Sequence, residues 1–173
     1  MNIRLLKVFV VAMLALWSSL TFLENVVSYS LHKGQVADVM AMGNIPDVFL
    51  SARPFVRELS PDLALLGIMI GKFIAAVCFV LATAKMWSAR NNAQAFKHAK
   101  QYVLAGAVFV SVMLFTMFFI FADIVYMIWL QGAEAAMVQQ YAFMYILAIS
   151  ALTMMVMQNE DDNMQLTGGE RHG

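Results

Sequence analysis

The sequence has a single cysteine, three histidines and no excess of charge of either sign. Cys78 has no second cysteine for an internal disulfide, and there is no Cys-x-x-Cys pair for a redox or zinc site. A quinone-linked thiol oxidase of the usual kind is therefore excluded. Lysine plus arginine number 11 and aspartate plus glutamate also number 11, so no net field favours nucleic acid or an acidic substrate.

The few histidines do not stand where a membrane cofactor would need them. Haem b in a helical bundle requires histidines within the spans, whereas His32, His98 and His172 fall in predicted loops or in the tail. No cluster of metal ligands is present, and the serines of the apolar runs lack a neighbouring base that would activate a nucleophile. We expect no cofactor, no metal site and no enzymatic activity.

What the sequence does contain is apolar residues, which make up 62% of it against 13% charged residues. Soluble domains have about 45–50% and about 25%. Four apolar runs, at residues 5–23, 63–84, 103–122 and 137–157, each approach the roughly 20 residues that cross a bilayer core of ~30 Å. We predict an all-α membrane protein with four transmembrane helices in an antiparallel up-down bundle. It forms one domain over residues 1–157, followed by a polar tail at 158–173.

The segment between the first two runs, residues 24–62, is predicted to be a partly helical extracytoplasmic loop. Val36, Val39 and Met40 recur at helical spacing before a stop signal at Gly43-Asn44. Farther on, apolar side chains alternate with prolines and charges, which suits either a cap lying in the membrane interface or a docking surface for a partner. Ser60-Pro61-Asp62 then favours the start of the second membrane helix.

The distribution of lysine and arginine predicts the orientation. If both termini are cytoplasmic, the outer segments contain Lys33, Arg53 and Arg57, and the inner segments contain Arg4, Lys7, Lys85, Arg90, Lys97, Lys100 and Arg171. The positive-inside rule favours this arrangement. The basic loop predicted at residues 85–101 is interpreted as this topology signal, and the alternative is an anionic-lipid or partner site.

Lys72 lies halfway along the second apolar run and is the one charge in it. Because a lysine at the centre of a span costs about 2.5–3.5 kcal/mol on insertion scales, its ammonium should face protein or trapped water. Glu24 and Asp123 are the charges at the outer edge of neighbouring runs, and we predict a polar membrane site made of Lys72, Glu24 and Asp123. A structural role in pairing helices and a role in an ion, lipid or ligand site both remain open.

Gly67, Gly71 and Ala75 recur every four residues beside Lys72. This spacing places them on one stripe of the helix and predicts a groove into which another helix can pack. The run Gly67-Ile-Met-Ile-Gly71-Lys72-Phe73 is not a phosphate-binding loop. It is one residue short, has no serine or threonine after the lysine, and lies within a membrane span.

Several short motifs are shared with a known family. They are Asn25 followed by Tyr29, Met42 with Pro46-Asp47, Asp123 followed by Tyr126, Met127 and Trp129, and the tail Gln158-Asn159-Glu160-Asp161. In these the chain resembles a bacterial family of small four-span inner-membrane proteins catalogued as a domain of unknown function. The resemblance implies the fold and a location in the bacterial inner membrane, and it supplies no activity. This sequence lacks the family's acidic residues near positions 28 and 72.

We expect an accessory, assembly or stabilising subunit of a larger inner-membrane complex, in contact with lipid and with other subunits. The groove at Gly67, Gly71 and Ala75 and the outer loop would be its contact surfaces. The alternative is a small homo-oligomeric transporter or channel, coupled to ions or protons, that uses Lys72 with Glu24 or Asp123. A weaker third possibility is a sensor that reads anionic lipid through Lys97 and Lys100.

Overall fold

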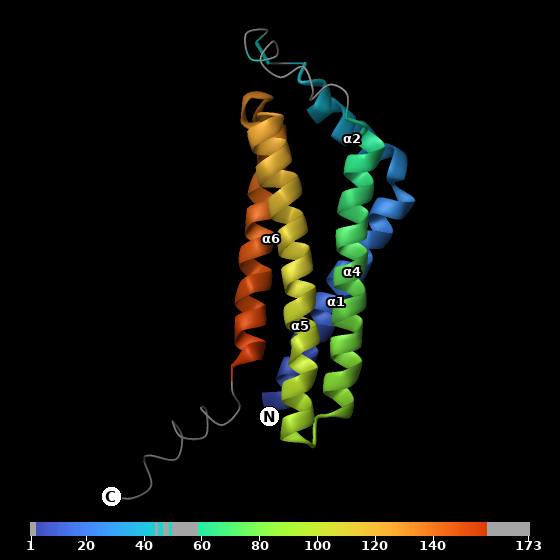
Figure 1. Cartoon of the computed structure of the whole chain (residues 1–173), viewed down its shortest axis with the longest axis vertical. Helices are drawn as coiled ribbons and strands as arrows, with labels where there is room; N and C mark the ends of the chain where they lie inside the picture. Colours follow the sequence, from blue (N-terminus) through green and yellow to red (C-terminus); the bar gives the residue numbers. More distant parts are fainter. Residues whose placement is uncertain (1–2, 44, 47–48, 50–58, 159–173) are drawn as a thin grey trace, which may run out of the picture.

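The computed structural model describes residues 3–43, 45–46, 49 and 59–158. Four long helical segments run roughly along one axis (Figure 1). They are α1 (Ile3–Val27), α4 (Pro61–Ser88), α5 (Ala93–Leu114) continued by the π-helix η2 (Phe115–Val125), and α6 (Ala133–Met157). All four are long and apolar enough to cross a membrane, and the described residues include no strand. The predicted four-span, all-α fold is confirmed.

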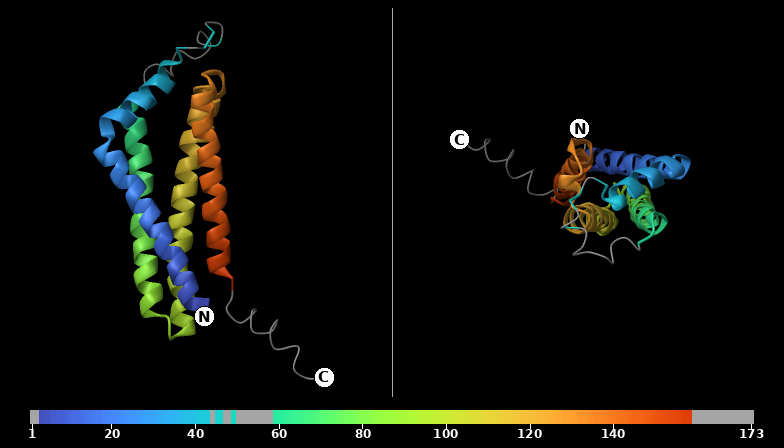
Figure 2. Two further views of the ribbon diagram at one scale, coloured as in Figure 1. Left: turned by 180° about the vertical axis from the view of Figure 1, so that it is seen from behind. Right: turned by 90° about the horizontal axis from the view of Figure 1, so that it is seen from above.

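The helices alternate in direction, so the N-terminus, the α4–α5 turn and the end of α6 lie at one end of the bundle (Figure 1). Here this end is named the hairpin end, after the α4–α5 turn. Helix α4 packs most extensively against α5 and α1. Figure 2 shows that α1 crosses the bundle obliquely, whereas α5 and α6 run nearly side by side. Helix α4 is therefore the central element of the packing.

The prediction of a loop at residues 85–101 was wrong. Helix α4 continues to Ser88, and α5 already begins at Ala93, with the Asn92 side chain accepting a hydrogen bond from the Ala95 N–H at 3.0 Å. Alanine, glutamine and lysine dominate the stretch after Asn92, and these residues favour helix in water as well as in lipid. The apolar run marks where the helix meets the membrane interface, and the helix itself extends beyond it.

The helix predicted within the outer segment is confirmed, and it starts earlier than the pattern of Val36, Val39 and Met40 indicated. It is α2 (Tyr29–Ala41), which follows α1 after a bend at Ser28. The Ser28 N–H donates to the Glu24 carbonyl at 2.8 Å, and its carbonyl accepts from His32 N–H at 3.0 Å, so hydrogen bonding continues through the bend. Helix α2 ends at Ala41, and the next residue, Met42, has a left-handed backbone conformation with φ 50°.

The first part of the outer segment caps the far end of the bundle. Met40, Met42 and Ile45 form a buried cluster with Tyr126 and Met127, which follow η2. The side-chain amide of Gln131, just after the short helix η3 (Ile128–Leu130), donates to the carbonyls of Val39 (2.8 Å) and Tyr126 (2.7 Å). A capping role is therefore observed for residues up to 45, whereas residues 50–58 lie outside the described part of the chain.

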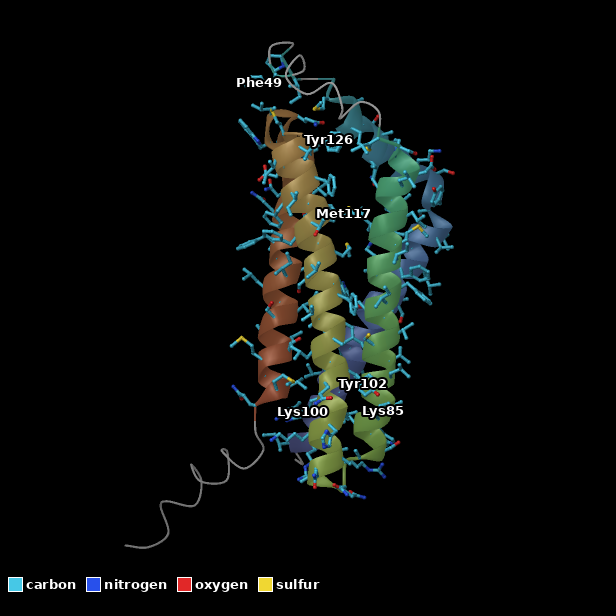
Figure 3. The ribbon with its side chains drawn as sticks, viewed as in Figure 1. Phe49, Lys85, Lys100, Tyr102, Met117 and Tyr126 are labelled. Atoms are coloured by element: carbon cyan, nitrogen blue, oxygen red, sulfur yellow. The ribbon has the colours of Figure 1, made fainter. Side chains whose placement is uncertain are left out.

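The stripe of Gly67, Gly71 and Ala75 is a packing surface inside this molecule. A Cβ atom built on Gly71 would lie 2.4 Å from Cγ of Met113, and one on Gly67 would lie 2.6 Å from Cε of Met117. Figure 3 shows Met117 where η2 faces α4. Ala75 is fully buried. Methionine side chains of the third span therefore fill the groove, which is not free to receive another protein.

This packing predicts that Gly71→Ala is destabilising by about 1–2 kcal/mol in detergent, after the helix-propensity gain of alanine is subtracted. The added methyl group would collide with Met113 close to its backbone, where the side chain has little freedom to move. Gly67→Ala should cost less, because it meets only the flexible end of Met117. Thermal unfolding followed by circular dichroism measures both.

Gly34→Ala is the matched control, because nothing lies within 4 Å of a Cβ at Gly34 in α2. It should leave the unfolding temperature unchanged or raise it. Equal stability of Gly71→Ala and Gly34→Ala would contradict the close contact between α4 and α5.

Candidate functional site

Lys72 binds the first membrane helix. Its ammonium donates to the side-chain oxygen of Asn25 at 3.0 Å and to the backbone carbonyl of Thr21 at 3.4 Å. Asn25 is itself buried, with 4% of its surface exposed. Thr21 and Asn25 lie four residues apart on α1, so both face α4. The charge inside α4 therefore joins it to α1 through neutral acceptors.

Glu24 lies next to Asn25 in the chain but binds elsewhere. Its carboxylate is 2.7 Å from Nε2 of His32 in α2, and Nδ1 of the same ring is 3.0 Å from the Gln35 side-chain oxygen. Among the described residues, no ion pair joins Glu24 to Lys72. The structure thus brings these two residues to neighbouring parts of α1 and α4 without the direct pair that was one possibility from the sequence.

Asp123 lies in η2 and does not join the other two. Its backbone carbonyl accepts the Met127 N–H at 3.0 Å. Within the part of the chain that the structure describes, its half-buried carboxylate makes no hydrogen bond or ion pair. The three residues predicted as one polar site are therefore not joined: Lys72 of α4 binds α1, Glu24 binds His32 of α2, and Asp123 lies in η2.

The segment around Asp123 is an 11-residue π-helix, Phe115–Val125. The π-helix is a rare conformation with hydrogen bonds from residue i+5 to residue i, and Tyr126 N–H donates in this way to the Phe121 carbonyl at 2.9 Å. The widened turn lets Phe115 and Phe119 stack at 5.5 Å, and Phe119 meets Phe143 of α6 at 6.3 Å. Phe119 thus contacts α6, whereas Phe115 is exposed on the bundle surface.

A second polar cluster ties α2 to the first turn of α4. The Tyr29 hydroxyl donates to one oxygen of Asp62 at 2.8 Å, and the Lys33 ammonium lies 2.8 Å from the other oxygen. The hydrogen bond to Asp62 is the main cause that raises the pKa of both Tyr29 and Lys33. Ser60 occupies the N-cap position of α4 as predicted, but its side chain makes no capping hydrogen bond.

At the hairpin end, two buried lysines hold the last helix. Lys7 of α1 and Lys100 of α5 are 3% and 2% exposed, and both donate to the carbonyl of Gln158, directly after α6. The C-terminal carbonyls of a helix carry partial negative charge, so two ammonium groups stabilise this end. In addition, Arg4 donates to the Arg90 carbonyl at 3.1 Å. The cluster of Lys7, Lys100 and the Gln158 carbonyl is called the inner clasp below.

Sequence reasoning missed the inner clasp because it assigned these lysines to the solvated, topology-setting charges. The helical spacing of the neighbouring apolar residues does indicate that these lysines are buried. Lys100 lies on the same helix face as Phe96 and Val103, and Lys7 lies on the face of Val11 and Leu14. All four apolar residues are buried. The burial of Lys100 also argues against the lipid-reading role considered for it.

In every described cluster a polar side chain joins two helices. The described residues include no group of three or more His, Cys, Asp or Glu side chains that could hold a metal ion. A family model with the description "Predicted small integral membrane protein (DUF2165)" matches residues 3–159. The chain belongs to this family. No curated protein and no solved structure matches the chain.

Membership of the DUF2165 family agrees with the resemblance seen in the short motifs and with the four spans of the structure. The protein is thus a multi-pass integral membrane protein of a family whose function is unknown. The family assignment carries no reaction and no ligand, so any function rests on the geometry of the chain itself.

The Lys72 contact predicts a measurable coupling between α4 and α1. Asn25→Leu should destabilise the protein by about 1–3 kcal/mol, because the ammonium loses its nearest acceptor. Lys72→Met in the Asn25→Leu background should recover part of this loss, giving a coupling of about 0.5–1.5 kcal/mol in a double-mutant cycle. Unfolding titrations of the four proteins in detergent provide the values.

Glu24→Gln is the control for an ionic contribution, because Glu24 bonds to His32 rather than to Lys72. We expect little coupling between Glu24→Gln and Lys72→Met. A coupling as large as that of Asn25 would show that the neighbouring carboxylate, and not the amide, anchors the lysine.

Proposed function

We propose that this protein is a non-catalytic accessory or assembly subunit of a larger complex in the bacterial inner membrane, with both termini in the cytoplasm. The observation that carries the proposal is the outward face of α6. This face presents a glutamine and two small side chains to the membrane, at Gln140, Ala148 and Ala151, all of them exposed.

Helix α6 is the span that the rest of the molecule covers least. Within its apolar window 22% of the residues are buried, against 33% for both α1 and the third span. Its exposed face also includes large apolar side chains, among them Met144 and Met154 at 61% and 71% exposure. Methionine is flexible and polarisable, so it adapts to the contours of a partner surface. The face is therefore suited to contact with another protein.

The chemistry of this face favours a transmembrane helix over lipid as its neighbour. Lipid tails cover apolar side chains without gain or loss, so association of membrane helices depends on close packing and hydrogen bonds. Ala148 and Ala151 let a second backbone approach, because their side chains are short. Gln140 lies near the outer start of the fourth apolar run, where its amide can hydrogen-bond to a polar group on a partner helix.

The groove first considered as a contact surface does not contribute. Met113 and Met117 fill it within the chain, as described above. The partner surface that we propose is thus the exposed face of α6. In the outer segment, Met40, Met42 and Ile45 already pack against Tyr126 and Met127.

The orientation rests on the arrangement of charge along the bundle. The hairpin end carries Arg4, Lys85, Arg90 and Lys97, and no aspartate or glutamate occurs between Asp62 and Asp123. The described carboxylates are Glu24, Asp38, Asp62, Asp123 and Glu134. They belong to helix ends and turns at the other end of the bundle. This separation supports a cytoplasmic hairpin end under the positive-inside rule.

The transporter alternative has one observation in its favour, a lysine inside α4. The contacts of Lys72 with Asn25 and Thr21 account for that lysine as a helix-pairing residue. Reconstitution into liposomes tests the alternative directly. An ion or solute flux that Lys72→Met abolishes would favour transport over the accessory role.

The accessory role predicts that the tagged chain, gently solubilised from its native membranes, migrates on a native gel with larger membrane proteins in fixed ratio. Mass spectrometry of the band identifies them. Ala148→Phe and Ala151→Phe should remove the partners, because the bulkier ring prevents close approach of a second helix on α6. Thermal unfolding of the purified variants shows whether each remains folded.

Val112→Phe is the matched control, since Val112 is equally open to the membrane on α5, at 58% exposure. It should retain the partners. A chain that always migrates alone or as a small multiple of itself would refute the accessory role. Partner loss in all three variants would refute the assignment of the surface to α6.

A further inference from the structure

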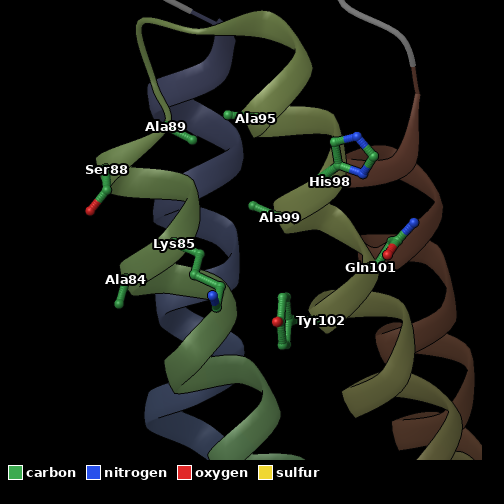
Figure 4. Close-up of a pocket in the computed structure, with 9 residues that line it drawn as sticks. All are labelled: Ala84, Lys85, Ser88, Ala89, Ala95, His98, Ala99, Gln101 and Tyr102. Atoms are coloured by element: carbon green, nitrogen blue, oxygen red, sulfur yellow. The ribbon is translucent and has the colours of Figure 1, made fainter.

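A hollow between α4 and α5 at the hairpin end is lined by both polar and small apolar side chains and has no assigned role. It has a volume of about 740 Å³, within the range of ligand pockets, and is lined by Lys85, Ser88, His98, Gln101 and Tyr102 with four alanines. It is called the polar hollow below. Figure 4 shows the Lys85 side chain reaching from α4 toward the ring of Tyr102 on α5.

The ammonium of Lys85 is held at the membrane interface in a position to bind an anion. It lies 5.0 Å from the centre of the Tyr102 ring, and within the described residues it forms no ion pair. Tyrosine and lysine at the end of a span are typical of the headgroup layer. The hydroxyl of Ser88 on the same helix turn adds a donor, so the wall from α4 offers charge and hydrogen bonding together.

A second hollow of about 700 Å³ lies on the other flank of α4, between α4 and α1. It is lined almost wholly by apolar side chains, including Leu5, Phe9, Ala12, Val80 and Trp87, and is called the apolar hollow. Along α1 it runs from Leu5 to Ala15, which is about 15 Å at ~1.5 Å per residue. That length is about half of a bilayer core of ~30 Å, the depth of one leaflet.

The two hollows meet at Ala84, which lines both. Ala84 is exposed and has a short side chain, so it forms a low point on the ridge of α4 between them. Above the apolar hollow, the Arg90 guanidinium stacks on Trp87 at 4.7 Å. A cation held on an aromatic ring therefore lies beside each hollow. Polar and apolar space joined in this way matches an amphiphile rather than a small soluble anion.

We propose that an anionic phospholipid binds here, with its phosphate at Lys85 in the polar hollow and an acyl chain across Ala84 in the apolar hollow. The charge around the site supports this choice. The hairpin end bears Lys85, Arg90 and Lys97 on exposed or half-buried positions, and no carboxylate interrupts the chain between Asp62 and Asp123. Basic pockets between membrane helices at the cytoplasmic face are suited to anionic headgroups.

This site differs from the lipid contact that the sequence indicated at Lys97 and Lys100. Lys100 is buried in the inner clasp, and Lys97 does not line either hollow. In the sequence, Lys85 falls in the basic segment predicted as a loop. Its position on α4 beside α5 is evident only when the two helices are packed together.

Native mass spectrometry of the full chain in detergent, after incubation with phosphatidylglycerol or phosphatidylcholine, tests the proposal. The wild-type chain should retain phosphatidylglycerol preferentially. Lys85→Gln should lower this retention about fivefold, because the phosphate loses the cation that lines the hollow. Ala84→Phe should also lower it, because the ring blocks the passage between the hollows while the charge is unchanged.

Lys97→Gln is the control, as it removes the same charge from an exposed position of α5 outside the hollows. It should retain phosphatidylglycerol like the wild type. Circular dichroism shows whether each variant is folded, and Ala84→Phe provides the test if Lys85→Gln is not. Equal retention by wild type and Lys85→Gln, or equal loss in Lys97→Gln, would overturn the site. Displacement of the lipid by excess inorganic phosphate would show a phosphate-anion site and overturn the lipid assignment.

Discussion

A lysine ammonium inside a membrane must find an acceptor in the protein, because hydrocarbon offers none and the cost of leaving the charge unsatisfied is several kcal/mol. Much of the described packing obeys this constraint. Lys72 binds Asn25 and the Thr21 carbonyl, which joins α4 to α1. At the hairpin end, Lys7 and Lys100 bind the Gln158 carbonyl, which joins α1 and α5 to the end of α6. Three charges thus connect the four spans.

The described acceptors of Lys72 are an amide oxygen and a backbone carbonyl, and this choice has a physical consequence. A neutral acceptor satisfies the ammonium without adding a second charge that must also leave water. Each contact also fixes the axial position of one helix relative to another, because a shift of one residue along the axis would move the acceptor away from the ammonium. The lysines therefore help to fix the register of the bundle, together with the close packing at the small residues of α4.

The small residues and Lys72 of α4 serve two different interfaces of the same helix. Gly71 admits Met113 at the close contact of α4 with α5, while Lys72, the next residue, points to α1. Helix α4 can pack against two neighbours because Gly71 admits α5 closely, while the charged side chain of Lys72 binds α1. Other molecules have access to the surfaces that the packing leaves exposed. These are the outward face of α6 and the two hollows beside Ala84.

The sequence by itself determined the four spans, their all-α character and the start of α4 at Pro61, because long apolar runs and a proline after serine act locally. It also marked Lys72 as a residue that needs a partner. Only the tertiary structure decided which partner: the sequence predicted Glu24 or Asp123, whereas the packing of α4 on α1 brings Lys72 to Asn25 and the Thr21 carbonyl. The π-helix at Phe115–Val125 and the inner clasp were likewise decided by packing. The helical periodicity of α1 and α5 places Lys7 and Lys100 on buried faces, but the acceptor that they share is set by how α6 packs against them.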